Sequence, residues 1–211
     1  MALRPPPAAL AGPNIVTLPA GAPVERVHDR RYGAAQFNPC KGAPTRFAPI
    51  RDADGECVPS LYAAGTVEAA IHETIFHDVP AGARRATVPV GLVRTRAHSR
   101  LEVLRGLRLA SLRAPDLRRW RVSRNSLIGA PPRLYPETAR WAAAIHRRFP
   151  EVEGLVWISS RCDPESAWLF FGDRVGPEDF RVASTRDGHG DATFLADVRE
   201  AGQRCGNGIA V

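Results

Sequence analysis

Four polar residues are candidates for a functional site: Arg46, Tyr62, Glu73 and Ser160. Arg46 lies in a loop framed by glycine and proline, Tyr62 in a short strand-like segment, and Ser160 at the end of an apolar segment. A guanidinium binds anions through a fork of N–H donors, and a carboxylate stabilises positive charge that develops during a reaction. Each residue type is common on surfaces or in half-buried strands, so the combination at these spacings is what indicates a site.

Several well-known catalytic motifs are not present. His72 and Glu73 resemble the start of the zinc-protease pattern H-E-x-x-H, but His77 comes one residue too late and falls about 140° around a helix from His72. Ser159 and Ser160 lack the flanking glycines of a nucleophile elbow. The glycine patterns of Rossmann and P-loop nucleotide sites are also missing. We therefore expect no metal ion and none of these enzyme classes.

Charge and hydropathy are those of an ordinary soluble globular protein. The 211 residues carry a formal net charge of +7, and Lys41 is the only lysine among the 29 Lys and Arg residues. This preference for arginine indicates compositional bias, so the charge points only weakly to nucleic acid. No apolar run reaches the roughly 18–20 residues that span a bilayer. Prolines interrupt the N-terminus where a signal peptide needs an apolar core, so we expect a cytoplasmic protein without membrane contact.

The four cysteines, Cys40, Cys57, Cys162 and Cys205, are far apart in the sequence. They form no C-x-x-C pair, so a structural zinc site is not expected. Because a protein that is not exported rarely needs disulfides, we expect reduced thiols, and we leave a contact between Cys40 and Cys57 open.

The chain divides into an arm, a folded unit and a tail. Residues 1–23 are rich in proline, alanine and glycine without helical or strand periodicity, which predicts an extended arm. Residues 24–183 form the predicted domain. Residues 184–211 are expected to be a tail with one short helix, over 192–202, that Asp191 caps.

The first half of the domain is expected to place Glu73 beside open space. A strand over 25–29 leads into long shaped loops, and a second strand covers 60–64. Thr66 then caps a helix over 67–78, whose apolar residues share one face. Glu73 points away from that face, and the residues beside it on the helix surface are small.

The second half is expected to hold a helix and a hairpin. Pro136 is suited to the first turn of a helix over 137–149. Apolar strands over 154–160 and 167–174 follow, joined by turn residues, so Ser159 and Ser160 lie at a strand end. The mixture of strands and helices predicts a single α+β domain with a central antiparallel or mixed sheet and flanking helices.

An arginine-rich segment, residues 84–124, contains twelve arginines and only two acids, Glu102 and Asp116. The arginines alternate with two apolar, strand-like stretches, residues 86–93 and 101–109, which favours a pair of strands with arginine-coated solvent faces. An anion-binding or partner-binding face is the alternative.

Three stretches in fixed order resemble one known family, the RES domain, which is the toxin half of bacterial Xre–RES toxin–antitoxin pairs. The likeness covers roughly residues 24–175. The double glycine that the family places before its arginine is absent here, and an extra acidic loop over 51–57 fills the gap before Tyr62. The matching stretches are Phe37-Asn38-Pro39…Gly42…Arg46-Phe47-Ala48-Pro49, Leu61-Tyr62-Ala63-Ala64…Ala69-Ala70-Ile71-His72-Glu73, and Gly154-Leu155-Val156-Trp157-Ile158-Ser159-Ser160-Arg161-Cys162-Asp163…Leu169-Phe170.

The resemblance implies a fold similar to ADP-ribosyltransferases and a reaction that consumes NAD⁺. Cleavage of the nicotinamide–ribose bond passes through an oxocarbenium-like state, and Glu73 is the residue expected to stabilise it. Arg46 is expected to neutralise the pyrophosphate, and Tyr62 to stack on nicotinamide or ribose. Ser160, selected over Ser159 by the Ser-Arg-x-Asp alignment, is expected to hold the substrate by a hydrogen bond.

Arg26 and His28 are expected to make secondary contacts to phosphate or ribose, with Arg31 as a further alternative. The resemblance also implies an Xre-family antitoxin, through which nucleic acid would be contacted only indirectly. The acceptor is left open between inorganic phosphate and water. Transfer of ADP-ribose to protein is an alternative within the same chemistry. A non-enzymatic nucleic-acid-binding module that uses residues 84–124 is the alternative of another class.

Overall fold

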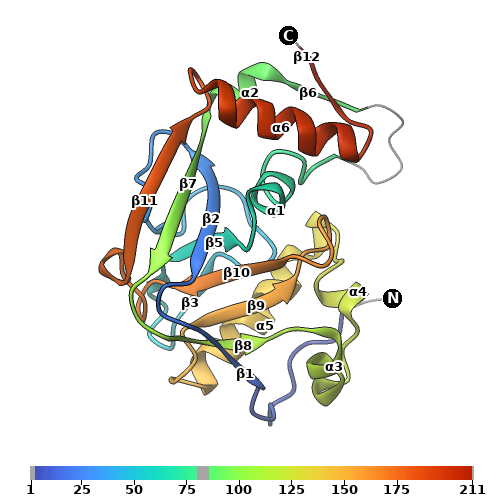
Figure 1. Cartoon of the computed structure of the whole chain (residues 1–211). Coiled ribbons are helices and arrows are strands. Elements are labelled where there is room, and N and C mark those ends of the chain that lie inside the picture. Colours follow the sequence, from blue (N-terminus) through green and yellow to red (C-terminus); the bar gives the residue numbers. More distant parts are fainter. Residues whose placement is uncertain (1–2, 80–85, 211) are drawn as a thin grey trace.

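An eight-stranded mixed sheet forms the centre of the computed structural model, which describes residues 3–79 and 86–210. The strand order is β1-β8-β9-β10-β5-β2-β7-β11, and only β8 and β9 run parallel. Figure 1 shows β2, β7 and β11 upright, with β8, β9 and β10 crossing below them. The strands are β1 (Ile15–Leu18), β2 (Pro23–Asp29), β5 (Ser60–Ala64), β7 (Arg96–Val103), β8 (Leu107–Ser111), β9 (Gly154–Ile158), β10 (Ser166–Phe171) and β11 (Phe180–Asp187).

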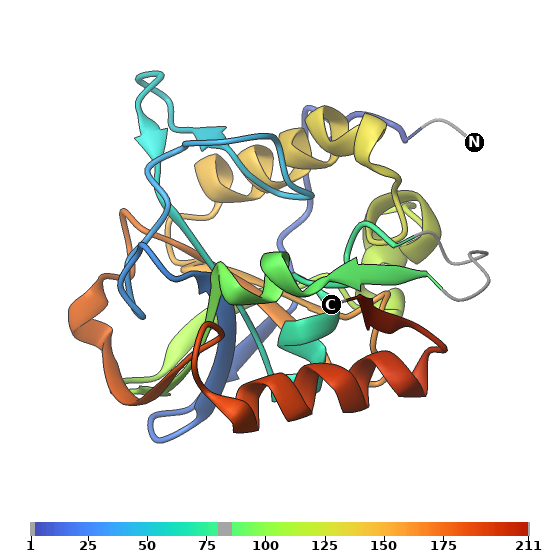
Figure 2. The ribbon, with the colours of Figure 1, turned by 90° about the horizontal axis from the view of Figure 1, so that it is seen from above.

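Helices cover the sheet from two sides. Figure 2 shows α5 along one side and α6 along the opposite side, with α1 beside α6. The helices are α1 (Val67–His72), α2 (Val90–Arg94), α3 (Ala114–Leu117), α4 (Arg124–Leu127), α5 (Tyr135–Arg148) and α6 (Ala192–Arg204). The 3-10 turns are η1 (Arg118–Trp120), η2 (Pro132–Leu134) and η3 (Pro177–Asp179). Two small sheets pair β3 (Ile50–Arg51) with β4 (Cys57–Val58), and β12 (Gly208–Ala210) with β6 (Thr87–Pro89).

Three apolar clusters hold these layers together. Trp141 and Ile145 of α5 pack on the face of β9 and β10 that carries Trp157 and Leu169. The opposite faces of those strands pack inside the curl of the sheet, against β2, β7 and β8. A third cluster, which includes Phe194, joins α1 and α6 to β2. Removal of this apolar surface from water is the main force that closes the curl.

The sheet splits between β2 and β5. These neighbours share a single registered pair, Glu25 with Ala64. By contrast, β2 pairs with β7 over all seven of its residues, and β5 pairs with β10 over all five of its residues. The two strands therefore diverge beyond Glu25, and the side chains of both line the opening.

The elements that position the predicted site residues are confirmed. The structure contains the expected strands at 25–29 and 60–64 and the expected helix with Pro136 in its first turn. The strand expected over 154–160 forms over Gly154–Ile158, so Ser159 and Ser160 follow its end. The strands β9 and β10 form the predicted antiparallel hairpin. The α+β class with a mixed sheet and flanking helices is also confirmed.

The helix predicted over 67–78 is wrong in length, because α1 ends at His72. Thr66 caps it as expected, accepting from the Ala69 N–H at 3.2 Å. Glu73 is the C-cap residue of α1, and the chain continues after it in turns and bends instead of helix. The Thr74 hydroxyl donates to the Val27 carbonyl of β2 at 3.3 Å, which ties this turn to the sheet. Glu73 is thus fixed at a helix end beside the split.

The two chain ends differ from the predicted arm and tail. Within residues 1–23, β1 pairs with all of its residues along β8 in the main sheet. Leu10 is buried, and the Trp141 and Trp120 indoles donate to carbonyls of residues 4 and 11 at 2.8 Å. At the other end, α6 begins at its cap Asp191 as predicted but packs into the third apolar cluster. The domain therefore extends beyond residues 24–183 at both ends.

The arginine-rich segment is more varied than the predicted pair of strands. Residues 90–94 form α2, where a strand was expected, because the chain turns there toward β7. The strands β7 and β8 do form, but they are not neighbours in the sheet. The strand-like text from 101 to 109 is broken by a turn at 104–106. Arg84 and Arg85 lie outside the described residues.

The expectation of four reduced thiols is wrong for two of them. Cys40 and Cys57 form a disulfide that closes the loop between them, and Cys162 and Cys205 are free. Every helix within the described part of the chain is too short or too polar to cross a membrane.

Candidate functional site

A cleft opens at the split between β2 and β5. It consists of two adjoining lobes, each with a cavity volume of about 590 Å³. We call the first the carboxylate lobe, because Glu73 lines it together with Tyr135 and Trp157. We call the second the loop lobe, because residues 36–43 form much of its wall. Both volumes lie within the range of ligand pockets. The lobes share the residues Arg26, Val27, Ala43, Thr45, Tyr62, Thr74 and Arg96.

The Glu73 carboxylate is held on the wall of its lobe by two donors. The Ser159 hydroxyl donates to Oε1 at 2.6 Å, and Arg46 Nη1 lies 3.5 Å from Oε2. The Glu73 side chain is 15% exposed, so it is open to a bound molecule while its position is fixed. Such fixed negative charge in a partly desolvated cavity interacts strongly with positive charge that develops near it.

Arg46 is buried beside this carboxylate, with its side chain only 5% exposed. Besides Glu73, its Nη2 donates to the Ser160 hydroxyl at 3.4 Å, and its guanidinium carbon lies 5.9 Å from the centre of the Tyr135 ring. Its Nε is buried and has no hydrogen-bond partner. The Thr138 hydroxyl of α5 donates to the Arg46 carbonyl and anchors the loop to the helix.

Tyr62 lines both lobes and also organises the Arg46 loop. Its hydroxyl accepts from the Phe47 N–H at 3.0 Å. The Thr45 hydroxyl donates to the Ala48 carbonyl, so it accepts the Tyr62 proton across 3.0 Å. Burial raises the pKa of Tyr62 to about 12, which keeps this hydroxyl protonated at neutral pH. The ring is thereby fixed between the two lobes.

The two adjacent serines contact different members of the site. Ser159 is fully buried, and its hydroxyl also accepts from the N–H groups of Arg161 and Cys162 at 3.0 Å. It therefore supports Glu73 directly. Ser160 contacts Arg46 instead. The alignment with the family motif gave no sign of the contact from Ser159, because that contact depends on how the strand end turns.

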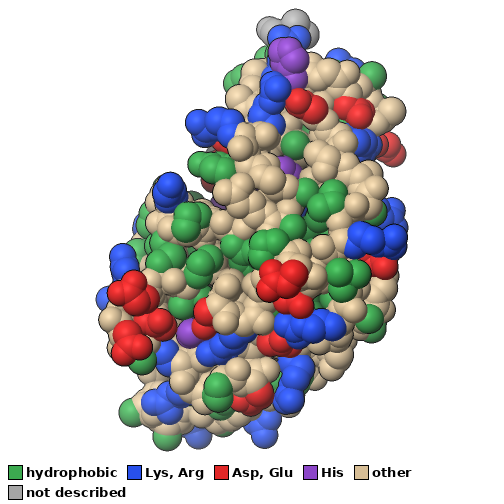
Figure 3. Space-filling model, turned by 90° about the vertical axis from the view of Figure 1, so that its left-hand side faces the viewer, with side chains coloured by type: hydrophobic (Ala, Val, Ile, Leu, Met, Phe, Trp, Pro, Cys, Tyr) green, Lys and Arg blue, Asp and Glu red, His purple; other side chains and the backbone are tan. Residues whose placement is uncertain are grey.

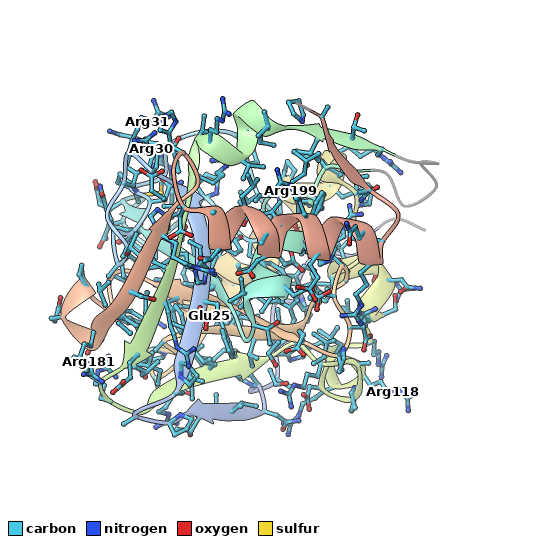
Figure 4. All side chains as sticks on the ribbon, turned by 45° about the horizontal axis from the view of Figure 1, so that its top comes forward. Glu25, Arg30, Arg31, Arg118, Arg181 and Arg199 are labelled. Atoms are coloured by element: carbon cyan, nitrogen blue, oxygen red, sulfur yellow. A yellow bond between two sulfur atoms is a disulfide. The ribbon has the colours of Figure 1, made fainter. Side chains whose placement is uncertain are left out.

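The secondary candidates separate into two groups. Arg26 lines both lobes, and His28 lines the loop lobe. The His28 ring contacts the Asp29 carbonyl and the Ser99 hydroxyl, and burial lowers its pKa to about 4, so it is neutral at pH 7. Arg31 lines neither lobe and instead forms an ion pair with Asp29 at the surface, with Arg31 Nη2 2.7 Å from Asp29 Oδ2. Figure 4 shows Arg31 at the edge of the molecule, far from the centrally placed Glu25.

Four residues that line the cleft were not predicted as site residues from the sequence: His77, Asp78, Arg96 and Tyr135. The Tyr135 hydroxyl bonds to His77 Nε2 at 2.9 Å, and His77 Nδ1 bonds to Asp78 Oδ1 at 2.8 Å. Arg96 lines both lobes from the start of β7. An aromatic residue before Pro136 was the only signal for Tyr135, and Arg96 was hidden among the other arginines of its segment.

Acidic and basic groups of the cleft differ in how they are paired. Glu25, which lines the carboxylate lobe, is bound by His98 at 2.8 Å, and Asp29 is bound by Arg31. Arg26 and Arg96 form no ion pair with any described residue. Within residues 3–79 and 86–210, no three His, Cys, Asp or Glu side chains gather as a metal site needs. The uncompensated charge of the cleft is positive.

The outer surface shows no comparable concentration of charge on the face in Figure 3. There, Lys and Arg side chains are scattered among Asp and Glu side chains around an apolar centre. A nucleic-acid-binding face would gather its basic residues into a patch or stripe. This face gives no support to direct binding of nucleic acid.

Comparison with known proteins agrees with the geometry. The chain shares its fold with a chain in the crystal structure of the M. tuberculosis MbcT–MbcA toxin–antitoxin complex, at a TM-score of 0.61 and 14% sequence identity. The match covers 85% of this chain and 90% of the other. A search among curated proteins finds no significant match. The model of the RES domain matches residues 23–193, a span that contains every residue of the cleft, and the chain therefore belongs to the RES-domain family.

Proposed function

We propose that the cleft binds NAD⁺ and cleaves its nicotinamide–ribose bond. The observation that carries this proposal is the Glu73 carboxylate, fixed by Ser159 and Arg46 on the wall of an open lobe. When the bond breaks, positive charge develops on the ribose ring. A preorganised carboxylate stabilises that charge without any reorganisation during the reaction.

One carboxylate is sufficient for this chemistry. Nicotinamide leaves as a neutral molecule because the ring is cationic while it is attached, so no general acid has to protonate it. Glu73 is accordingly the only acid that the proposal uses. Glu25 also lines the lobe, but it is engaged with His98.

The remaining residues position the substrate. Tyr62 presents its ring at the junction of the lobes, where it can stack on nicotinamide or ribose. The Ser160 hydroxyl accepts a hydrogen bond from Arg46, and the Arg46 guanidinium lies beside the Glu73 carboxylate. NAD⁺ has two nucleotide halves, and the cleft has two lobes. In our proposal the nicotinamide half lies beside Glu73 in the carboxylate lobe, and the adenosine half lies in the loop lobe.

We further propose that the protein acts as a toxin that an antitoxin silences. Membership of the RES-domain family supports this role, and the structure that shares the fold comes from a toxin–antitoxin complex. An antitoxin of the Xre class would act by covering the cleft. The proposed reaction depletes a cofactor that cells require, which explains the need for such a partner.

The test is to incubate the purified protein with NAD⁺ labelled in its adenine half. Release of nicotinamide by the wild type, and its loss in Glu73→Ala, is the expected result. No release by the wild type, or equal release by both proteins, would refute the proposal. The labelled product identifies the acceptor: ADP-ribose indicates water, a phosphorylated ADP-ribose indicates phosphate, and label on protein indicates ADP-ribosyl transfer.

A further inference from the structure

Residues 39–44 form a rim segment along the edge of the cleft. Residues 39–43 line the loop lobe, and Ala43 and Pro44 line the carboxylate lobe, so the rim segment borders both lobes. A Cβ added at Gly42 would meet no atom within 4 Å. The structure describes all six residues, and none of them belongs to the three apolar clusters. The rim segment therefore has little packing to hold it in place.

The rim segment is tied to the fold at its two ends. Before it, the backbone of Asn38 pairs with that of Ser60 on β5, with N···O distances of 2.8 and 3.0 Å. After it, the Thr45 hydroxyl bonds to that of Tyr62 at 3.0 Å. The bonds between Asn38 and Lys41 are local, because they close a turn and reach no other element.

The Cys40–Cys57 disulfide joins the rim segment to a firm anchor. Cys57 lies in β4, and its neighbour Val58 is buried in the apolar cluster beneath α5. Cys40 Sγ also lies 3.7 Å from the carbonyls of Ile50 and Val58, but a bridged sulfur has no proton to donate. Among the described residues, the disulfide is therefore the one bond that links residues 39–44 to another element.

Two further features favour opening of this bond in a reducing medium. Cys40 has a φ of 61°, in the left-handed region that a residue other than glycine occupies only at a cost. Both cysteines are half-buried, and Cys40 lines the loop lobe, so a small thiol can reach the bond from the open cavity. Reduction removes the link and releases a backbone that is held in an unfavourable conformation.

We propose that the Cys40–Cys57 disulfide is a redox latch of the cleft. The oxidised form holds the rim segment in place around the substrate, and the reduced form releases it. A dithiol reductant breaks the S–S bond, each cysteine sulfur gains a hydrogen atom, and the reductant is oxidised to its own disulfide. Because the latch regulates the site assigned above, its effect on turnover rests on the proposed function, whereas release of the rim segment does not.

The carboxylate wall of the cleft does not depend on the latch. The bond from Ser159 to Glu73 joins parts of the chain that lie outside residues 40–57. The Thr138 hydroxyl also continues to hold the Arg46 carbonyl when the disulfide is open. We therefore expect reduction to act on binding more than on the reaction, with KM for NAD⁺ about tenfold higher and kcat changed less than about twofold.

Lys41 provides a direct measure of order in the rim segment, because it is the only lysine in the chain and lies within this segment. A lysine-specific protease cleaves only there, and cleavage requires the residues around Lys41 to leave the fold. The protein is digested in oxidised or reduced dithiothreitol, and a lysine-containing peptide in the same solutions corrects for effects on the protease. We expect the reduced protein to be cleaved at least about tenfold faster.

Two variants separate the latch from the other thiols. Cys40→Ser/Cys57→Ser has no bond to break, so it is expected to be cleaved as fast as the reduced wild type under both conditions. Cys205→Ser lacks an exposed free thiol but keeps the disulfide, so it is expected to respond like the wild type. Equal cleavage of the oxidised and reduced wild type would overturn the proposal.

Counting free thiols after unfolding establishes the state of the bond in each sample. Two thiols, Cys162 and Cys205, are expected for the oxidised wild type, and all four cysteines for the reduced protein. Four free thiols in protein that has been treated with oxidised dithiothreitol would show that the bond does not form, and would refute the latch.

Turnover distinguishes failure of the latch from failure of the proposed function. KM for NAD⁺ is expected to rise on reduction of the wild type and to return on reoxidation, whereas the double variant keeps the higher value throughout. Faster cleavage at Lys41 with an unchanged KM would contradict the regulatory role. Should the wild type release no nicotinamide in either state, the proposed function fails, while cleavage at Lys41 still decides whether the disulfide holds the rim segment.

Discussion

Ser159 and Ser160 are adjacent in sequence but support different parts of the site. Ser159 is fully buried and donates to Glu73 at 2.6 Å, while Ser160 contacts Arg46 at 3.4 Å. Neither serine lines the cavity walls. Both therefore act as positioning residues, one for the carboxylate and one for the guanidinium.

Ser159→Ala is expected to lower kcat for nicotinamide release at least tenfold, because Glu73 loses its shorter hydrogen bond. The variant also leaves the N–H groups of Arg161 and Cys162 without their acceptor, which costs about 1–3 kcal/mol in the free energy of unfolding. Ser160→Ala is the matched control, with a smaller change in kcat and an unchanged unfolding free energy. Steady-state kinetics and urea unfolding measure both. A larger loss of kcat in Ser160→Ala would assign the main role to Ser160.

His28 makes stability depend on pH in a defined direction. Burial lowers its pKa from 6.5 to about 4, so the unfolded chain binds a proton between those values that the folded protein does not. Stability contributed by neutral His28 is complete above pH 6.5 and is lost as the pH falls toward 4. We expect His28→Gln to flatten the fall in unfolding free energy between pH 7 and pH 4.5. Parallel slopes for both proteins would contradict this reading of His28.

At the level of elements, the loop that carries Arg46 is closed at its base. Cys40 and Cys57, 17 residues apart, form a disulfide on either side of it, and Cys40 also lines the loop lobe. The crosslink joins the two ends of this loop and restricts the unfolded chain. We therefore expect the bond to help order the loop that carries Arg46.

The double variant Cys40→Ser/Cys57→Ser is expected to lose about 3 kcal/mol of unfolding free energy, the amount usual for a closed loop of this length. Its KM for NAD⁺ is expected to rise because Arg46 and the loop lobe are less well ordered. Urea unfolding and steady-state kinetics measure the two effects. Cys205→Ser removes an exposed free thiol and serves as the control, with neither effect. An unchanged double variant would show that the bond does not support the loop.

The N-terminal segment contributes a strand and core contacts. Leu10 is 7% exposed and belongs to the apolar cluster beneath α5. We expect Leu10→Ala to destabilise the protein by about 2–5 kcal/mol, as for other buried leucines. Leu104→Ala makes the same chemical change at a position that is 50% exposed, and it is expected to alter stability by less than about 0.5 kcal/mol. Equal unfolding midpoints for the two variants would mean that the segment does not pack.

Local patterns predicted the elements around the site because those elements obey local rules. The cap at Thr66, the strand with Tyr62 and the hairpin that ends at Ser159 follow from residue preferences and apolar periodicity. The length of α1 did not follow, because the bond from Thr74 to the Val27 carbonyl is a contact with a distant strand.

Long-range pairing also accounts for the other differences. The proline-rich segment before residue 24 has no strand periodicity, yet β1 forms because its backbone pairs with the edge of β8. Arg96 could not be told from its neighbouring arginines, since only the split between β2 and β5 gives it a cavity to line. Features that depend on which strands diverge cannot be predicted from local sequence patterns.

For the whole molecule, the curl of the sheet determines where chemistry can occur. Two halves of one sheet pack over a shared apolar cluster and separate only at β2 and β5. The cleft at this split is lined by Arg26, His28, Arg46, Tyr62 and Glu73, whereas Ser160 contacts Arg46 without lining either lobe and Arg31 lies outside the cleft. A partner that covers the split would block both lobes at once, which is the simplest way for an antitoxin to act.

The proposed reaction depends on the Glu73 carboxylate, and the variant Glu73→Gln tests this dependence most directly. Glutamine keeps the shape of the side chain and an oxygen that accepts from Ser159, so the buried Arg46 retains a polar neighbour and the fold is expected to persist. The measurement is kcat for nicotinamide release from NAD⁺, with the melting temperature of each protein as the control for folding. We predict that kcat falls at least 100-fold, about 3 kcal/mol in the activation barrier, at an unchanged melting temperature. A folded Glu73→Gln variant that releases nicotinamide at the wild-type rate would contradict the central claim.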